Sequence, residues 1–367
     1  MKGQNKKITL AVTAFYGGGA ERVMVTLANK LVALNYPVDL IVAKDDGPYR
    51  EMLDERVSKI VLLRNEKFFL TKIFLGFLRA YKYFRSNSGA QVMSTIREFN
   101  MLIYLAYAFS GSKGRIVLRE ADTLDRLLND LSLRNRVFIY LMRKVYHKAD
   151  HIVANCEITK SDLVEQLGLS PARISVIYNP LSLDKISSSA SHLNDFYIVA
   201  CGRLTYKKNF GDLIKVFPLL LERYPELNLL VLGVGEEENT LKEQAFQLGI
   251  SKHISFVGFV KNPYSYFKGA KVFVQTSLWE GFGYVLAEAM ACGTPLVAYD
   301  GKGAMREILE DGKYGKLVPI GSLELLAKAI IMQIESPMPS ELLLEGAARF
   351  DADKITAKYI SVITAWA

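Results

Sequence analysis

The stretch ITLAVTAFYGGGAERVMVTLANKLVALNYPVDLIVA, residues 8–43, decides the fold class. It begins with an apolar run over 8–15, passes through a glycine turn at 17–19 into a helical pattern over 20–34, and ends in a second apolar run over 38–43. Strand, glycine turn, helix and strand in this order are typical of a parallel sheet covered by helices. The sequence therefore predicts an α/β protein that opens with a doubly wound unit.

Two series of short apolar runs extend this pattern along the chain. In the first half they lie at 59–63, 91–96, 115–118, 151–154 and 175–178, and in the second half at 196–201, 227–232, 254–257, 272–275 and 295–298. A Ser-rich stretch at 187–191 separates the two series and reads as a linker. We expect two doubly wound parallel sheets that face each other across a cleft, with ligands at the carboxyl ends of the strands.

The domain limits follow from this division. The first domain is predicted over 1–185 and the second over 192–351, and a C-terminal helix of about 352–367 is left free to pack back on the first domain. The 367 residues, half of them hydrophobic, are enough for a substantial core in each. The three cysteines are widely spaced, without a CxxC pair, and read as reduced core residues.

No segment reaches the length that a membrane span needs, and the apolar run after the basic N-terminus is interrupted by threonines. The sequence thus predicts a cytoplasmic chain that does not cross a bilayer. Its charge is uneven: residues 1–180 hold 27 Lys and Arg against 17 Asp and Glu, a net +10, and residues 181–367 hold 19 against 21. The front half is expected to meet an anionic partner, and no nucleic-acid recognition motif accompanies the charge.

The most specific motif is EGFGYVLAEA at 280–289, which follows a predicted strand. Its glycines let main-chain N–H groups approach a ligand, and the helix that starts near Tyr284 presents its positive end to phosphate or sugar oxygens. Glu280 in the loop and Glu288 in the helix are expected to line one pocket. The alternative is an ordinary strand-to-helix turn with solvated acids.

A basic turn, GRLTYKKN at 202–209, follows the first strand of the second half. An arginine and a lysine at the carboxyl end of a strand suit a diphosphate. Other nucleotide motifs fail: the glycines at 17–19 and 233–235 do not complete G-x-G-x-x-G, and no P-loop is present. The only Asp-x-Asp, at 351–353, precedes a helical pattern and reads as a cap, so we expect no catalytic metal and no cofactor.

Together these segments resemble glycosyltransferase family 4, whose members have the GT-B fold and act with retention of anomeric configuration. The resemblance rests on GGGAER at 17–22, NP at 179–180, GRLTYKKN at 202–209, LGVGEE at 232–237, FVGFV at 256–260 and EGFGYVLAEAMACGTPLVA at 280–298. It implies that Arg203 and Lys208 hold the donor diphosphate, that Glu280 binds the transferred sugar and that Glu288 binds the ribose. It further assigns to the donor site Gly18, Gly19, Gly202, Gly258, Phe259, Gly281, Phe282, Gly283, Tyr284 and Val285.

One departure from the family concerns the first domain. Members often carry a histidine after a strand there, whereas this chain reads Arg119-Glu120-Ala121-Asp122. The polar role on the substrate side is expected to pass to Glu120, as a catalytic group, or to Arg119 or Asp122 on the acceptor side, where Asn179 is also placed. The four histidines lie elsewhere and read as structural or surface residues.

The resemblance implies transfer of a hexose or N-acetylhexosamine from a nucleotide sugar, most simply a UDP-sugar, to a lipid-linked or polysaccharide-precursor acceptor. A nucleotide-sugar epimerase of the same fold and a non-catalytic binding protein are the alternatives. Residues 67–85 support a membrane location, because five cations fall within an arc of about 140° on a helical wheel among phenylalanines and leucines. An ordinary helix packed on the first sheet is the competing interpretation. The oligomeric state is left open.

Overall fold

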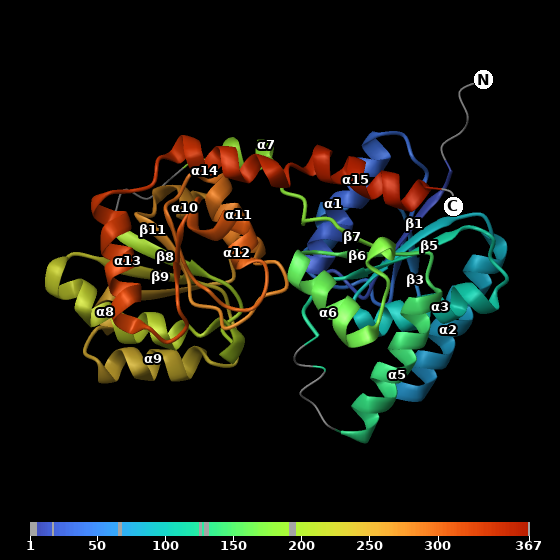
Figure 1. Ribbon diagram of the computed structural model, residues 1–367, viewed down its shortest axis with the longest axis horizontal. Coiled ribbons are helices and arrows are strands. Elements are labelled where there is room, and N and C mark those ends of the chain that lie inside the picture. The colour runs from blue at the N-terminus through green and yellow to red at the C-terminus, as the bar shows by residue number, and fades with distance from the viewer. Residues whose placement is uncertain are drawn as a thin grey trace. The chain divides into compact units, whose positions relative to one another are not determined.

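The structure is a computed structural model that describes residues 6–16, 18–64, 68–124, 127, 132–190 and 196–365. The chain forms two compact units, one of residues 1–180 with 352–367 and one of residues 181–351 (Figure 1). The chain thus changes unit after Pro180, before the predicted Ser-rich linker. That stretch begins inside the second unit, because α7 (Leu183–Ser187) packs on α11 (Tyr284–Ala291). The C-terminal helix α15 (Ala352–Thr364) lies in the first unit.

The first unit is built on a parallel sheet of seven strands in the order β3-β2-β1-β4-β5-β6-β7. The strands are β1 Ile8–Val12, β2 Val38–Val42, β3 Ser58–Val61, β4 Gln91–Thr95, β5 Arg115–Glu120, β6 His151–Ala154 and β7 Ile174–Val176. Every residue of β1 and β2 is buried, as expected for central strands covered on both faces. The order reverses between β1 and β4, which is the topological switch point of this sheet.

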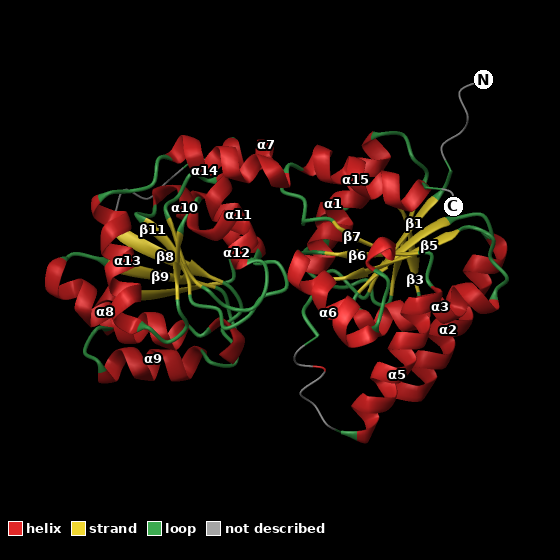
Figure 2. Ribbon diagram, viewed as in Figure 1, coloured by secondary structure: helices red, strands yellow, loops and turns green. Residues whose placement is uncertain are grey.

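Helices cover both faces of this sheet (Figure 2). One group packs into the core that contains Leu118 and Ile152: α2 Phe69–Ser86, α3 Arg97–Phe109, α5 Leu133–Lys148 and α6 Glu157–Leu167. On the other side α1 (Gly19–Ala33) packs on β1, and α15 packs on α1, β4 and β5. Short 3-10 turns stand at Arg50–Met52 and Pro171–Arg173.

The second unit repeats the plan with six parallel strands in the order β10-β9-β8-β11-β12-β13. They are β8 Tyr197–Cys201, β9 Asn228–Leu232, β10 Ile254–Gly258, β11 Val272–Gln275, β12 Leu296–Tyr299 and β13 Lys316–Val318. The helices are α7, α8 Phe210–Arg223, α9 Glu238–Gln247, α10 Tyr264–Gly269, α11, α12 Met305–Ile308, α13 Leu323–Glu335 and α14 Ser340–Ala347. Its 3-10 turns are Tyr206–Lys208, Ser251–His253, Glu310–Gly312 and Ala348–Phe350.

The predicted fold class is confirmed: both units are doubly wound parallel sheets. The second sheet reverses its order between β8 and β11, so the loops that follow these two strands are the expected ligand-binding loops. They carry GRLTYKKN and EGFG, respectively. Within the described ranges, no helix combines the length and the apolar character needed to cross a membrane.

Candidate functional site

The carboxyl ends of four neighbouring strands form the floor of the candidate site in the second unit. Gly202 N–H donates to the carbonyl of Leu232 over 2.9 Å, and Gly233 N–H donates to the carbonyl of Gly258 over 2.8 Å. These bonds join the ends of β8, β9 and β10, and Leu278 N–H donates to the carbonyl of Lys207, which joins the loop after β11 to the turn after β8. The predicted motif segments therefore meet at one edge of the sheet.

The loop that carries Glu280 is supported by the loop after β12. Glu280 N–H donates to the carbonyl of Lys302 over 2.9 Å, and Trp279 forms a parallel bridge with the same residue. A Cβ on Gly303 would lie 1.8 Å from the Glu280 carbonyl oxygen, so only glycine fits there. Sequence reasoning missed this support, although the glycines at 301 and 303 directly after a strand were a usable signal.

The central feature is an ion pair between Lys208 and Glu280. The Lys208 ammonium donates to Glu280 Oε1, and Ser277 Oγ donates to the same oxygen over 2.9 Å. Lys207 Nζ lies 3.9 Å from Oε2. Glu280 is only 7% exposed. Burial by itself raises the pKa of its carboxyl group, but the two lysine ammonium groups and the hydrogen bonds outweigh burial and lower that pKa below the usual value.

Arg203 differs from this pair because its side chain is exposed. The residues that the structure describes provide it with no hydrogen-bond or ion-pair partner, so its guanidinium remains available to an anionic ligand. Next to it, Tyr206 is exposed, and its ring lies 6.3 Å from that of Trp279. The turn after β8 thus offers one unpaired cation, Arg203, and two lysines that lie beside the Glu280 carboxylate.

Glu288 lies in α11 and is 1% exposed. Its Oε1 accepts a 2.9 Å hydrogen bond from the hydroxyl of Tyr264 in α10. Burial, together with the Glu288 charge, raises the pKa of the neighbouring Cys292 thiol to about 12. Phe259, directly after β10, is exposed and suited to contact a base.

The residues at and before the start of α11 differ in whether they can offer a ligand their side chain or only main-chain groups. The ring of Phe282 is buried against that of Phe350, with centroids 5.5 Å apart, so Phe282 can contribute only main-chain groups. Gly281 and Gly283 flank it, and the half-buried Tyr284 and Val285 form the first turn of α11. This agrees with the main-chain role expected for the 281–283 segment, which remains a prediction.

In the first unit Arg119 is a structural residue. Its side chain is 0% exposed and donates to Tyr359 Oη, Thr95 Oγ1 and Asn179 Oδ1 over 2.9, 3.1 and 2.5 Å. Arg119 and Asn179 thus hold each other inside the fold, and an acceptor-side role for either remains a prediction. The sequence missed this network because Tyr359 is 240 residues away.

Glu120 is likewise paired inside the first unit. Its Oε1 accepts from Arg97 over 2.8 Å, its Oε2 accepts from Tyr146 over 2.9 Å, and the side chain is buried. Both oxygens are thus engaged within the unit, and the catalytic role expected for Glu120 remains a prediction. Asp122 is exposed and remains a predicted acceptor-side residue.

The glycine turn of the first unit lies at the start of α1. Gly18 immediately precedes the helix and Gly19 is its first residue, whereas Gly17 lies outside the described residues. Two of the histidines that were expected at structural or surface positions bond within the first unit: His147 to the carbonyl of Leu167 and His151 to Ser175.

No group of three or more His, Cys, Asp or Glu residues within the described part of the chain is arranged to hold a metal ion. Asp353, in the predicted helix cap, pairs with Lys30 over 2.7 Å. Metal independence remains a prediction.

Two family models match successive parts of the chain: Glycosyltransferase Family 4 over residues 17–185 and Glycosyl transferases group 1 over residues 184–349. The chain belongs to glycosyltransferase family 4. It is a transferase, and the resemblance stated from its motifs is confirmed.

Among curated relatives, the N-acetylgalactosamine-N,N'-diacetylbacillosaminyl-diphospho-undecaprenol 4-alpha-N-acetylgalactosaminyltransferase of Campylobacter jejuni is 29% identical, with 86% of each chain covered. The phosphatidyl-myo-inositol mannosyltransferase of Mycobacterium leprae is 31% identical over 63% of each chain. Among solved structures, Anabaena Alr3699/HepE in complex with UDP matches with a TM-score of 0.81, at 21% identity, over 98% of this chain and 99% of that one. WaaG, a glycosyltransferase involved in lipopolysaccharide biosynthesis, matches with a TM-score of 0.76, at 14% identity, over 98% and 100%. The fold of this glycosyltransferase is GT-B.

Proposed function

We propose that this glycosyltransferase transfers a hexose or N-acetylhexosamine, with retention, from a UDP-sugar to a lipid-linked or polysaccharide-precursor acceptor of a bacterial surface glycan. The observation that carries the proposal is the buried Lys208–Glu280 pair beside the exposed Arg203. A donor diphosphate needs cations at the carboxyl end of β8, and a sugar needs a fixed acceptor for its hydroxyl groups. Both kinds of group stand at one edge of the second sheet.

The role of each residue in the proposed transfer follows from where charge develops during the reaction. As the nucleoside diphosphate leaves, negative charge grows on its phosphates and positive charge on the anomeric carbon. Arg203, Lys208 and the N–H groups at the start of α11 stabilise the first charge without a metal. Glu280 holds the sugar through its hydroxyl groups, and the acceptor attacks on the face that the diphosphate leaves. A leaving phosphate oxygen takes the acceptor's proton.

Two observations support UDP as the nucleotide. Glu288 is a carboxylate that can accept hydrogen bonds from ribose hydroxyl groups, and Tyr264 donates to one of its oxygens. The structurally similar Anabaena protein has been crystallised with UDP and with UDP-glucose. A UDP-sugar is therefore the first donor to test.

The acceptor class comes from the relatives. The Campylobacter protein is named for a diphospho-undecaprenol substrate and the Mycobacterium leprae protein for a phosphatidyl-inositol substrate. Each of these names contains a lipid. We infer a lipid-linked acceptor here, used at the inner face of the cytoplasmic membrane.

Two helices of the first unit support contact with an anionic membrane surface. The residues at the start of α2 expose apolar side chains, namely Phe68, Leu70, Ile73 and Phe74, and Phe74 is 61% exposed. Further along α2, Ala80 and Phe84 pack into the core of the first unit. The start of α2 therefore fits a membrane-facing helix, and its later part fits a helix packed on the first sheet. Lys67 of the predicted cationic arc lies outside the described residues, and Arg79 is engaged with the carbonyl of Leu62.

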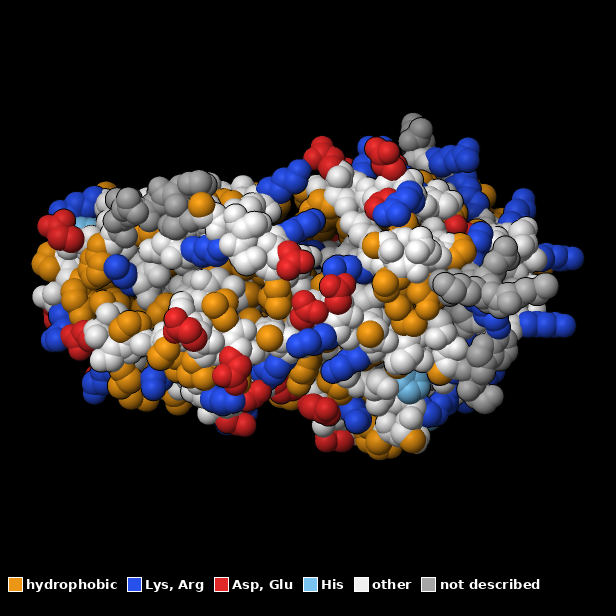
Figure 3. Space-filling model, turned by 90° about the horizontal axis from the view of Figure 1, so that it is seen from above, with side chains coloured by type: hydrophobic (Ala, Val, Ile, Leu, Met, Phe, Trp, Pro, Cys, Tyr) orange, Lys and Arg blue, Asp and Glu red, His pale blue; other side chains and the backbone are white. Residues whose placement is uncertain are grey.

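Sequence reasoning missed α5, which packs on the same helix, α3, as α2 does. It contains no acidic residue, and its exposed apolar side chains are Leu133, Val137, Tyr140 and Leu141. Exposed cations accompany them: Arg134, Arg136, Arg143, Lys144 and Lys148. Apolar side chains among cations suit a bilayer with anionic headgroups. Lys and Arg side chains also project around the edge of the first unit in Figure 3.

The donor is tested by thermal shift and by turnover. UDP should raise the melting temperature more than GDP or dTDP does, and a UDP-hexose or UDP-N-acetylhexosamine should be converted to UDP with or without EDTA. Equal stabilisation by all three nucleotides contradicts a specific UDP pocket. A strict need for Mg²⁺ or Mn²⁺ contradicts the metal-free chemistry.

Sedimentation with liposomes tests the membrane contact. Binding should increase with the share of anionic lipid, weaken in high salt and fall in the Lys144→Glu/Lys148→Glu variant. The Lys252→Glu/Lys328→Glu variant makes the same change of charge at exposed positions of the second unit and should bind as the wild type does. Failure of the wild type to sediment with any lipid mixture would refute the membrane claim.

A further inference from the structure

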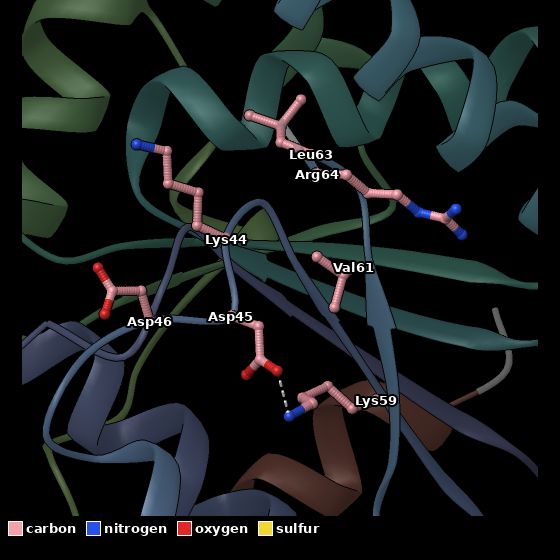
Figure 4. Close-up of a pocket in the computed structure, with 7 residues that line it drawn as sticks. All are labelled: Lys44, Asp45, Asp46, Lys59, Val61, Leu63 and Arg64. Carbon is pink, nitrogen blue, oxygen red and sulfur yellow. Dashed lines mark ion pairs between the residues drawn. The ribbon is translucent and has the colours of Figure 1, made fainter. Parts of the chain in front are cut away.

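A cavity of about 660 Å³ opens at the carboxyl ends of β2 and β3 in the first unit (Figure 4). Lys44, Asp45 and Asp46 line it from the loop after β2, Lys59 and Val61 line it from β3, and Leu63 and Arg64 line it from the residues after β3. Its volume lies in the range of small-molecule sites. None of the residues assigned above to donor binding or catalysis lines it.

On one side of the cavity the carboxylate of Asp45 is paired with cations. Asp45 Oδ2 lies 2.6 Å from the ammonium of Lys59, drawn as a dashed line in Figure 4, and its Oδ1 lies 3.1 Å from Nε of Arg50. These two cations outnumber the Asp45 carboxylate by one charge, so this side of the cavity carries no net negative charge. Asp45 therefore gives the cavity its shape and contributes little free charge.

The other two charged groups of the loop have no such partners. Lys44 and Asp46 are exposed, and within the described residues neither side chain has a hydrogen bond or an ion pair. In Figure 4 the Lys44 ammonium and the Asp46 carboxylate extend to the same side of the loop. A ligand there meets one group that only donates hydrogen bonds and one that only accepts them.

The loop is held rigidly against the end of β1. Phe15 N–H donates to the carbonyl of Asp46 over 2.8 Å, and Tyr49 N–H donates to the carbonyl of Phe15 over 3.2 Å. Gly47 has a φ of +121°, and a Cβ there would lie 2.3 Å from the Phe15 backbone. The cavity wall is thus tied to the strand that leads into the Gly18 turn, and β1 stands at the switch point of the sheet.

We propose that this cavity binds a sugar ring of the acceptor. Hydroxyl groups both donate and accept, so a sugar satisfies Asp46 and Lys44 together, while the aliphatic side chain of Val61 offers a surface to its C–H groups. A phosphate group would gain from Lys44 and from Arg64, which also lines the cavity, but it would repel the Asp46 carboxylate and leave it without a hydrogen-bond donor. The inference rests on the proposed function in one respect, since it takes the hydroxyl-bearing ligand to be the acceptor.

The test uses the full chain saturated with UDP and three probes: the methyl α-glycosides of glucose, galactose and N-acetylgalactosamine. Saturation-transfer NMR should detect binding of at least one of them. Asp46→Asn and Lys44→Met should each weaken that binding by about tenfold, the usual effect of removing a hydrogen bond to a charged group. Glu55→Gln, an exposed carboxylate outside the cavity, is the matched control and should leave binding unchanged.

Calorimetry with UDP is measured on the same samples, so the two proposals are judged separately. Absence of UDP binding counts against the proposed donor and leaves the glycoside result to decide on the cavity. The cavity proposal is overturned if no glycoside binds, if the Asp46 and Lys44 variants bind as the wild type does, or if inorganic phosphate displaces the glycoside.

Discussion

The hydroxyl of Tyr264 in α10 donates a 2.9 Å hydrogen bond to Oε1 of Glu288 in α11, 24 residues further along the chain. Both side chains are buried. The bond occupies one carboxylate oxygen and orients the other, so Tyr264 positions the residue that is proposed to bind the ribose of the donor.

Tyr264→Phe is predicted to raise the KM for the UDP-sugar by about tenfold while kcat changes little, because the lost contact concerns binding rather than the reacting bond. Glu288→Gln should also reduce the preference for UDP over dUDP. Steady-state kinetics and competition by the two nucleotides measure this. Tyr266→Phe, in the same helix, is the control, and an unchanged KM in Tyr264→Phe would contradict the positioning role.

Lys208→Met and Glu280→Gln are each predicted to reduce kcat by about a hundredfold or more, since each removes a preorganised charged group from the site. The double variant should lose less than the product of the two single losses, because each single change already breaks the pair. Circular dichroism checks that the variants fold. Lys215→Met, at an exposed ion pair, should keep full activity, and strictly multiplicative losses would argue against a functional pair.

The stability of the protein should depend on Glu280 in acid. Its folded-state pKa is lowered by Lys208 and Lys207 against the opposing effect of burial, so the ionised carboxylate stabilises the fold. This contribution is complete above the unfolded-state pKa, about 4.5, and is lost as the pH falls through the lower folded-state value. Urea unfolding as a function of pH should show a smaller loss of stability below about pH 4.5 in Glu280→Gln than in the wild type. Parallel pH profiles would show that the carboxylate makes no such contribution.

Tyr359→Phe is predicted to lower the free energy of unfolding by about 1–3 kcal/mol, because it removes a hydrogen bond from the buried guanidinium of Arg119. Urea denaturation measures the change. Tyr140→Phe, at an exposed position, should cost less than about 0.5 kcal/mol. Equal stability of the two variants would mean that the Arg119 network does not hold α15 on the sheet.

Much of the site could be predicted before the tertiary structure was known. Glycine turns and strand ends are local features, and in a parallel sheet all strands deliver their following loops to one edge. The stretches 202–209 and 280–289 could therefore be assigned to a common edge from their order and spacing alone.

The pairing of Arg119 and Glu120 inside the fold could not be predicted from the sequence, for a physical reason. A charged residue at a strand end looks the same in the sequence whether it faces a ligand or is paired inside the fold. Its partner decides, and for Arg119 the partners are Thr95, Asn179 and Tyr359. Tyr359 is brought close only by the packing of α15 on β4 and β5.

The amino-acid sequence alone determined the two doubly wound sheets and the loops that carry the chemistry, because periodicity and glycine turns act over a few residues. The tertiary structure alone decided that Lys208 and Glu280 pair across 72 residues, that Gly303 supports the Glu280 loop, and that α5 exposes apolar side chains. These facts depend on strand order and on which helix faces are covered, and both arise from packing between distant segments.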